Sequence, residues 1–287
     1  MTTQRASEPW RLPRGDEVET HVPQGIDTSK AHPARMYDYF LGGKNNFAAD
    51  RTAAEQIMAG APEVPIVVRA SRDFLARAVR SAVADYGMTQ FLDIGTGIPA
   101  PGNIHEVAQA ILPEARVAYV DNDPIVLAHA RALIAGDPRG RTGIVQADVR
   151  EPEKIVAAPE VREVIDFDKP VVVVLSMVLH FLRDSEDPDG IVATLRGALA
   201  PGSMLIFTHV TYRTEELKRF AEEVYDKASA PVVPRTRERI EELLDGFAPV
   251  EPGLVKVIAW RPDPDGPEPT PEELDTMTVY GAVAHLV

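Results

Sequence analysis

An acidic residue and two glycines follow a short apolar stretch near residue 90, in a pattern that can bind a nucleotide. The run FLDIGTG passes from large apolar side chains into a glycine-containing turn. Glycine lets the backbone approach a ligand closely, and exposed N–H groups in such a turn can bind an anionic group. Asp93, Gly95, Thr96 and Gly97 are therefore candidate ligands of a nucleotide cofactor. A tight turn that binds nothing has the same pattern.

A second acidic position follows the next apolar stretch. Residues 117–120 lead into Asp121, Asn122 and Asp123, with Pro124 behind them. A carboxylate at Asp121 can accept hydrogen bonds from both hydroxyls of a ribose. Asp123 before a proline is typical of the cap of a helix, and the simpler alternative is that both acids only cap that helix.

A third acidic position, Asp148, follows the apolar stretch at 144–147. Its carboxylate can accept the exocyclic amine of an adenine, and Val149 can offer a backbone N–H and an apolar wall. An aspartate at the end of one strand is common by itself. Three acidic strand ends beside a glycine turn favour a nucleotide site.

A candidate general base follows the apolar run at 171–175. His180 is the side chain best suited to exchange a proton near neutral pH, and Ser176 lies just before it in sequence. A histidine that hydrogen-bonds a neighbour within a helical turn explains the same residue. Tyr212, beyond the next apolar stretch, is a candidate wall of a substrate pocket.

Other kinds of catalytic site find no support in the sequence. The chain has no cysteine, and its seven histidines are scattered without the spacing of a metal-ligand pair, so we expect no metal. The Gly-x-Ser-x-Gly motif of hydrolases and the Gly-Lys-Ser of phosphate-binding loops are absent.

The formal net charge of −14 opposes binding to nucleic acid, which needs clustered lysine and arginine. The N-terminus shows no signal-peptide pattern, and no apolar run reaches the ~18 residues of a membrane span. We therefore expect a cytoplasmic protein with no nucleic-acid or membrane partner. A content of 45% hydrophobic and 26% charged residues is ordinary for a globular chain.

The elements that must position these residues alternate from residue 88 onward, which predicts an α/β fold with a parallel sheet covered on both faces. We expect strands at 90–94, 116–120, 143–147, 170–175, 203–209, 254–260 and 277–285. We expect helices at 103–112, 124–135, 188–199, 214–228 and 235–245, the first opened by a capping box of Asn103 and Glu106.

The N-terminal third has a different organisation. Residues 1–30 are polar and rich in proline, glycine and charge, which predicts a disordered arm. Residues 31–87 should form a helical cap whose first helix, Pro33–Leu41, ends at Gly42 in a left-handed conformation. Residues 88–287 should then form the main domain.

These motifs resemble those of the class I S-adenosylmethionine-dependent methyltransferases. Asp93, Gly95 and Gly97 match the first-strand loop of that family, while Asp121 matches the acid that holds the ribose and Asp148 the one near adenine. The resemblance implies a Rossmann-like mixed sheet of seven strands in the order 3-2-1-4-5-7-6, and S-adenosylmethionine as cofactor with S-adenosylhomocysteine as product.

A closer resemblance covers nearly the whole chain after residue 30. The segment from Pro33 to Arg51, with its Gly-Gly-Lys-Asn-Asn-Phe run, is similar to an actinobacterial S-adenosyl methyltransferase-like family of undefined substrate. In physical terms this segment can close over the methionine end of the cofactor as a lid. Tyr39, Gly43, Asn46 and Arg51 are its candidate cofactor ligands. An ordinary helical hairpin with its aromatic residues in the core is the alternative.

The sequence therefore predicts methyl transfer from S-adenosylmethionine to a small-molecule acceptor. Two alternatives remain. One is a non-catalytic or regulatory protein that binds the cofactor, and the weaker one is an NAD-dependent oxidoreductase.

Overall fold

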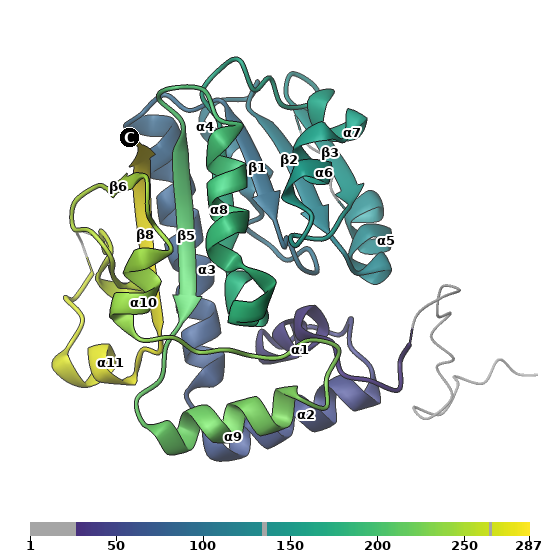
Figure 1. Ribbon diagram of the computed structural model, residues 1–287, viewed down its shortest axis with the longest axis vertical. Coiled ribbons are helices and arrows are strands. Elements are labelled where there is room, and N and C mark those ends of the chain that lie inside the picture. Colours follow the sequence, from purple (N-terminus) through teal and green to yellow (C-terminus); the bar gives the residue numbers. More distant parts are fainter. Residues whose placement is uncertain (1–26, 134–136, 264–265) are drawn as a thin grey trace, which may run out of the picture.

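Alternating strands and helices from residue 90 onward build one mixed sheet with helices on both faces (Figure 1). The computed structural model describes residues 27–133, 137–263 and 266–287. Most of the arm expected at residues 1–30 therefore lies outside the described residues.

The sheet has the order β3-β2-β1-β4-β5-β8-β6, with β7 paired to β8. Strands β1 to β5 run parallel, and β8 is antiparallel to β5 and β6. The strands are β1 (Gln90–Ile94), β2 (Arg116–Asp121), β3 (Arg141–Gln146), β4 (Val172–Ser176), β5 (Met204–Val210), β6 (Phe247–Pro249), β7 (Val255–Lys256) and β8 (Val279–Leu286).

The helices connect and cover these strands. They are α1 (Pro33–Phe40), α2 (Ala48–Gly60), α3 (Val64–Ala84), α4 (Ile104–Ile111), α5 (Pro124–Leu133), α6 (Pro152–Ala157), α7 (Pro159–Arg162), α8 (Pro188–Gly197), α9 (Glu215–Tyr225), α10 (Arg237–Glu242) and α11 (Pro271–Thr276). Three 3₁₀ turns complete the set: η1 (Leu179–Phe181), η2 (Asp184–Glu186) and η3 (Val257–Ala259).

The central strands are buried on both faces, as their continuous apolar sequence predicts. In β4, Val172 and Val174 pack in a core with α3 and α4, whereas Val173 and Leu175 pack in a second core with α6, α7 and α8. This alternation follows from the two-residue period of a strand. The two cores hold the carboxyl ends of the parallel strands at one edge of the sheet.

A third, smaller core lies beyond that edge. Helices α1, α2 and α9 gather there with the first turns of α3, and we call this group the roof (Figure 1). Met36, Phe40, Ile57 and Val224 are buried at its centre. Segments far apart in the sequence therefore enclose the edge of the sheet where the acidic strand ends lie.

The predicted architecture and strand order are confirmed, but the sheet has eight strands where we expected seven. Strand β6 pairs with β8 in the place expected for a strand at 254–260. In that segment, β7 gives way to η3 because the carbonyls of Val257 and Trp260 accept hydrogen bonds from Arg77 of α3, at 2.7 and 3.2 Å. These two carbonyls are therefore not available for hydrogen bonds to a neighbouring strand.

Three short helices, α6, α7 and α11, were not expected. Each begins with a proline at its first position, a signal that is easily missed in segments of four to six residues. Among the described residues, no helix is both long and apolar enough to cross a membrane.

Candidate functional site

A cavity of about 630 Å³ lies between the carboxyl ends of β1 to β4 and the roof. Its volume falls in the ~300–1,000 Å³ range of pockets that hold small molecules, and this edge of an open α/β sheet is the usual place for a ligand. Most of the site residues expected from the sequence line it: Asp93, Gly95, Thr96, Gly97, Asp121, Asn122, Asp148, Val149, Ser176, His180 and Tyr212.

The glycine turn after β1 has the backbone geometry that its sequence predicts. Gly95 and Gly97 have φ angles of +79° and +69°, in the left-handed region that side chains disfavour. A Cβ atom on Gly95 would lie 2.6 Å from Cγ2 of Val178, so only glycine fits against the loop after β4. The Gly95 N–H donates to the carbonyl of Val120 at 2.8 Å, which fixes the turn beside β2.

Asp121 lies at the end of β2 with 7% of its surface exposed. One carboxylate oxygen accepts the N–H of Gly97 at 2.8 Å and the other that of Asp123 at 2.9 Å. Burial raises the pKa of Asp121 to about 6, and those two N–H donors oppose the rise. The side chain therefore links the glycine turn to the β2 loop and lines the cavity.

Asp93, at the end of β1, is also buried, and burial raises its pKa to about 7. The nearby cation that opposes this rise is Arg72 of α3. Arg72 donates to the carbonyls of Ala100 and Pro101, each at 3.2 Å, and lines the cavity beside the glycine turn. A positive charge is thus held next to the expected cofactor loop.

Asp123 has the role of helix cap, since one of its oxygens accepts the N–H of Ile125 at 2.9 Å. Its second oxygen faces the roof, 3.2 Å from Nδ1 of His32 and 3.6 Å from Nε of Arg35. The same carboxylate therefore caps α5 and forms an ion pair with Arg35 of the roof, although its second oxygen accepts no hydrogen bond within the described part of the chain.

Asp148, after β3, is held by a neighbouring arginine. Arg150 donates to both of its oxygens, at 2.9 and 2.6 Å, and the amide of Asn122 donates to it at 3.3 Å. The Arg150 hydrogen bonds are the main cause that lowers the pKa of Asp148 to about 2. Asp148 is thus an ionised acceptor, and Val149 completes this end of the cavity.

The loop after β4 begins with a strained residue. Met177 has a φ of +57°, uncommon for a side chain of its size, and its N–H donates to Oγ1 of Thr208 at 2.8 Å. This turn sets Val178 against Gly95 and directs η1 across the cavity. Ser176 lines the cavity at the start of the same turn.

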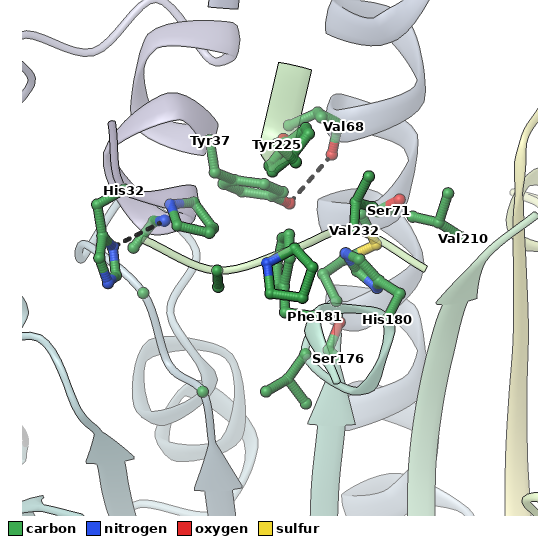
Figure 2. A pocket seen from close by; sticks show the side chains of 18 of the residues that line it. His32, Tyr37, Val68, Ser71, Ser176, His180, Phe181, Val210, Tyr225 and Val232 are labelled. Carbon is green, nitrogen blue, oxygen red and sulfur yellow. Dashed lines mark hydrogen bonds between the residues drawn. The ribbon is translucent and has the colours of Figure 1, made fainter. Parts of the chain in front are cut away.

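His180, in η1, is 1% exposed and lines the cavity (Figure 2). Its Nδ1 atom has no hydrogen-bond partner within the described ranges. The ring lies against Phe181 and His209, at centroid distances of 4.2 and 5.6 Å. Burial lowers the pKa of His180 well below its ordinary value, and the charge of Arg235 adds to this, so the ring is neutral.

Arg235 holds the polypeptide around His180 in place. It is 4% exposed and donates to the carbonyls of Leu179 and Leu182, at 3.2 and 2.8 Å. It also bonds Asp184 at 2.8 Å and the Nε2 atom of His209 at 2.9 Å. Because an arginine only donates, this nitrogen of His209 accepts and its Nδ1–H donates to the carbonyl of Val210 at 2.8 Å.

Four candidate ligands from the N-terminal segment lie elsewhere: Tyr39, Gly43, Asn46 and Arg51 are not among the residues that line the cavity. The Tyr39 hydroxyl donates to Glu55, and the Asn46 amide donates to Asp38 and to the Gly43 carbonyl. Arg51 donates to Asn46. Their polar groups shape the turn between α1 and α2, so we do not retain them as ligands.

Other roof residues reach the cavity instead, among them His32, Arg35, Tyr37 and Phe40. The helical period explains the choice, because Tyr37 and Phe40 are three residues apart and share one face of α1, whereas Tyr39 points away from that face. Tyr212 lies at the rim, with the ammonium of Lys218 4.9 Å from its ring centroid.

The capping box predicted at the start of α4 does not form. Glu106 accepts the N–H of Gly102 at 2.7 Å, one residue before the expected position, and the Asn103 side chain accepts from Ala100. The glycine and proline residues before the helix bend the chain so that Gly102 meets the glutamate.

Sequence reasoning missed two arginines that shape the site. Arg72 has a detectable signal, because it follows Val68 by four residues and precedes Leu75 by three, within the apolar stripe of α3. Arg235 has none that we find, since its partners come from η1, η2 and β5. Among the described residues, no group of three or more acidic or histidine side chains is arranged to hold a metal.

Comparisons with known proteins agree with this geometry. The sequence model of a family described as S-adenosyl methyltransferase matches residues 19–286. The crystal structure of a DUF574 family protein from Streptomyces avermitilis is similar at 41% identity and a TM-score of 0.85, over 91% of this chain and 99% of its own. That of a proposed methyltransferase from Thermobifida fusca is similar at 39% identity and a TM-score of 0.84, over 93% and 99%. No curated protein matches the sequence.

Proposed function

The chain belongs to the S-adenosyl methyltransferase family, and from that premise we propose which residues bind S-adenosylmethionine and what kind of acceptor is methylated. The observation that carries the proposal is the buried carboxyl of Asp121, which lies at the end of β2 and is hydrogen-bonded to the positive-φ turn of Gly97. A ribose with two adjacent hydroxyls is the group that such a carboxylate can bind in bidentate fashion.

The residues present fit the adenosine half of the cofactor. Asp121 would accept the ribose hydroxyls, and Asn122 lies beside it. Asp148 is ionised and offers acceptor capacity beyond its bonds to Arg150, since a carboxylate has about four lone-pair sites. Val149 supplies an apolar wall for the base. These four residues lie at or just after the ends of the neighbouring strands β2 and β3, along one side of the cavity.

The residues also fit the methionine half. Gly95 and Thr96 bring the backbone close, and the turn at Ser176 and Met177 lies against it on the other side. Arg72 lies close enough to reduce the cost of burying a carboxylate there, as it does for Asp93. We therefore propose Arg72 as a counter-charge to the cofactor's carboxylate.

When bound, the cofactor supplies a methyl group on a sulfonium that is reactive by itself. The chain's contribution is then to hold the acceptor atom in line with that methyl group and to exclude water. The roof serves this second role in our proposal, because residues of α1 and α9 line the cavity on the side away from the strand ends.

We further propose that the acceptor is a small molecule. The cavity of about 630 Å³ lies between the sheet edge and the roof and has the size of a small-molecule pocket, and a net charge of −14 disfavours a nucleic-acid acceptor. Cytoplasmic location remains a proposal from the sequence.

Calorimetry tests the cofactor assignment. Purified protein should bind S-adenosylmethionine and S-adenosylhomocysteine but not NAD. Binding of NAD with no response to either sulfur nucleotide would contradict the proposal. Tight cofactor binding without methyl transfer to any compound of a small-molecule extract, followed with labelled cofactor, would favour a binding protein that lacks turnover.

A further inference from the structure

One part of the cavity is distinct in its chemistry from the part assigned to the cofactor. Beyond Val178 the walls come from α1, α3, η1, α9 and the segment 229–234 (Figure 2). We call this part the acceptor compartment and define it by Tyr37, Val68, His180, Phe181, Tyr225 and Val232. None of these side chains is ionised at neutral pH.

Aromatic rings form much of this wall. Phe181 and Tyr225 lie with centroids 5.9 Å apart and an interplanar angle of 35°, and Tyr37 lines the compartment from α1. Aromatic faces bind planar apolar groups by stacking and edge contacts. The shape of the wall therefore favours a flat ligand.

Charged groups at the rim are already paired. Arg213 and Glu63 form an ion pair at 2.6 Å, and Arg183 lies 3.6 Å from Asp226. The charge of Arg72 reaches Tyr37, but the proposed function assigns Arg72 to the carboxylate of the cofactor. An ionised acceptor would therefore enter the compartment without a counter-charge of its own, and the burial of an unpaired charge is strongly unfavourable. The wall therefore favours an uncharged ligand.

A polar atom without a partner marks where a ligand should be recognised. Within the described part of the chain, Nδ1 of His180 is buried and has no hydrogen-bond partner. The Tyr37 hydroxyl, by contrast, is occupied, since it donates to the carbonyl of Val68 at 3.3 Å. A buried polar atom left unpaired is costly, so a ligand that pairs with it gains affinity.

We propose that the acceptor compartment binds a planar, uncharged aromatic molecule with a phenol-type hydroxyl. This hydroxyl hydrogen-bonds to the His180 ring, and its oxygen is the atom that is methylated. This inference rests on the proposed function, because the methyl donor is S-adenosylmethionine. His180 is placed for the role by its position in η1, two residues after Val178, which contacts the glycine turn.

The transfer balances with these groups alone. A lone pair of the hydroxyl oxygen forms the new bond to the methyl carbon, the carbon–sulfur bond breaks, and its electron pair stays on sulfur. The hydroxyl proton passes to a nitrogen of His180 and from there to water. Because burial disfavours the protonated imidazole, His180 can hold the proton only briefly, and a phenol, which is more acidic than an alkyl alcohol, releases its proton more readily.

Three probes with the same naphthalene ring test the proposal: 2-naphthol, naphthalene and 2-naphthoate. Their binding is measured by calorimetry with the protein saturated in S-adenosylhomocysteine. We expect 2-naphthol to bind about tenfold more tightly than the other two. His180→Phe should remove most of that preference, about 3- to 10-fold, with naphthalene affinity changed less than twofold. His285→Phe, at the far end of β8, is the matched control and should keep the preference.

His180→Gln is a control for misfolding. Its side-chain amide can still form a hydrogen bond, so this variant should keep part of the preference for 2-naphthol over naphthalene. Equal affinities for the three probes, preference for 2-naphthoate, or no binding of any probe by protein that binds S-adenosylhomocysteine would overturn the acceptor class alone. Failure to bind S-adenosylhomocysteine would instead contradict the proposed function.

Discussion

At the scale of single residues, the site depends on two buried carboxyls with unusual acidities. Burial raises the pKa of Asp93 to about 7 and that of Asp121 to about 6. Folding therefore favours their protonated forms. This stabilisation is fully present below the ordinary carboxyl pKa of 3.8, and it is lost as the pH rises through 6 to 7.

Cofactor binding should have the opposite pH dependence. Asp121 accepts both ribose hydroxyls best when ionised, so affinity for S-adenosylmethionine should rise between pH 5 and 7 and then level off. Asp121→Asn should weaken binding at pH 8 by roughly 1.5–3 kcal/mol, or about 10- to 150-fold, and flatten the pH profile. Calorimetry over this pH range measures both effects.

Asp245→Asn is the control, because the Asp245 side chain is 88% exposed and distant from the cavity. It should keep the affinity and the pH profile of the parent protein. If the Asp121→Asn variant bound the cofactor like the parent protein, Asp121 would not be a ribose ligand. Its role would then be to link the glycine turn to the loop after β2.

Gly95 offers a test of the close contact between the glycine turn after β1 and the loop after β4, which carries Val178. Gly95→Ala adds a Cβ atom 2.6 Å from Val178 at a φ of +79°, whereas Gly253→Ala has a similar φ of +87° and nothing within 4 Å. Both substitutions should cost roughly 1–2 kcal/mol of stability for the left-handed backbone. Only Gly95→Ala should also weaken cofactor binding. Thermal melts measure the loss of stability in both variants, and calorimetry measures the loss of cofactor affinity.

The residues that sequence reasoning located share a physical reason. Gly95, Asp121 and Asp148 follow strands directly, and the ends of parallel strands meet at one edge of the sheet. The role of Arg235 could not be predicted from the sequence, because its partners are brought together only by the tertiary structure. Tyr39 and Asn46 were misplaced because composition cannot reveal which face of a short helix or turn meets the sheet.

At the scale of elements, the roof depends on one buried carboxylate. Asp50 is fully buried and accepts the N–H groups of His32 and Phe47, each at 2.8 Å, with Arg35 at 3.7 Å. It ties the start of α1 to the start of α2. Asp50→Ala would leave both N–H groups and the guanidinium without this partner.

We expect Asp50→Ala to destabilise the roof by about 2–6 kcal/mol, from ~1–3 kcal/mol for each of the two N–H groups left unpaired. Amide hydrogen exchange should accelerate across 33–60 while β1 and β4 stay protected, and cofactor affinity should fall. Asp73→Ala, at an exposed position of α3, should change neither. Faster exchange of the whole sheet would show that the roof and the sheet unfold together.

Arg235 should have a similar effect on the loop after β4. Arg235→Met leaves the carbonyls of Leu179 and Leu182 unpaired, which should lower the free energy of unfolding by about 2–4 kcal/mol in urea titrations. Arg219→Met, which removes an exposed arginine from α9, should cost less than about 0.5 kcal/mol. Equal stability of the two variants would mean that the loop is held by packing alone.

The elements themselves were largely predictable. Strands β2, β4 and β5 contain continuous apolar runs, and α5 and α8 each begin with a capping aspartate and a proline. The exceptions have a common cause. Strand β7 stops early because the following carbonyls bond to Arg77, and no local pattern announces a partner 180 residues away in sequence. Likewise, α9 belongs to the roof although it follows β5.

At the scale of the whole molecule, the negative net charge should prevent binding to nucleic acid. A net charge of −14 repels a phosphate backbone. We expect no shift of a 20-base-pair duplex in gel electrophoresis at about 10 µM protein and physiological salt. A shift that disappears at higher salt would reveal a basic patch and open the question of a nucleic-acid acceptor.

The position of β8 has a consequence for synthesis. The ribosome makes Val279–Leu286 after every other strand, yet this strand lies between β5 and β6 and pairs with seven residues of β5. Until it leaves the exit tunnel, the nascent chain carries β5 with an unpaired edge, a template for pairing with other chains. A pause in translation between the codons for Val210 and Val279 would therefore prolong the lifetime of an aggregation-prone intermediate that chaperones must shield.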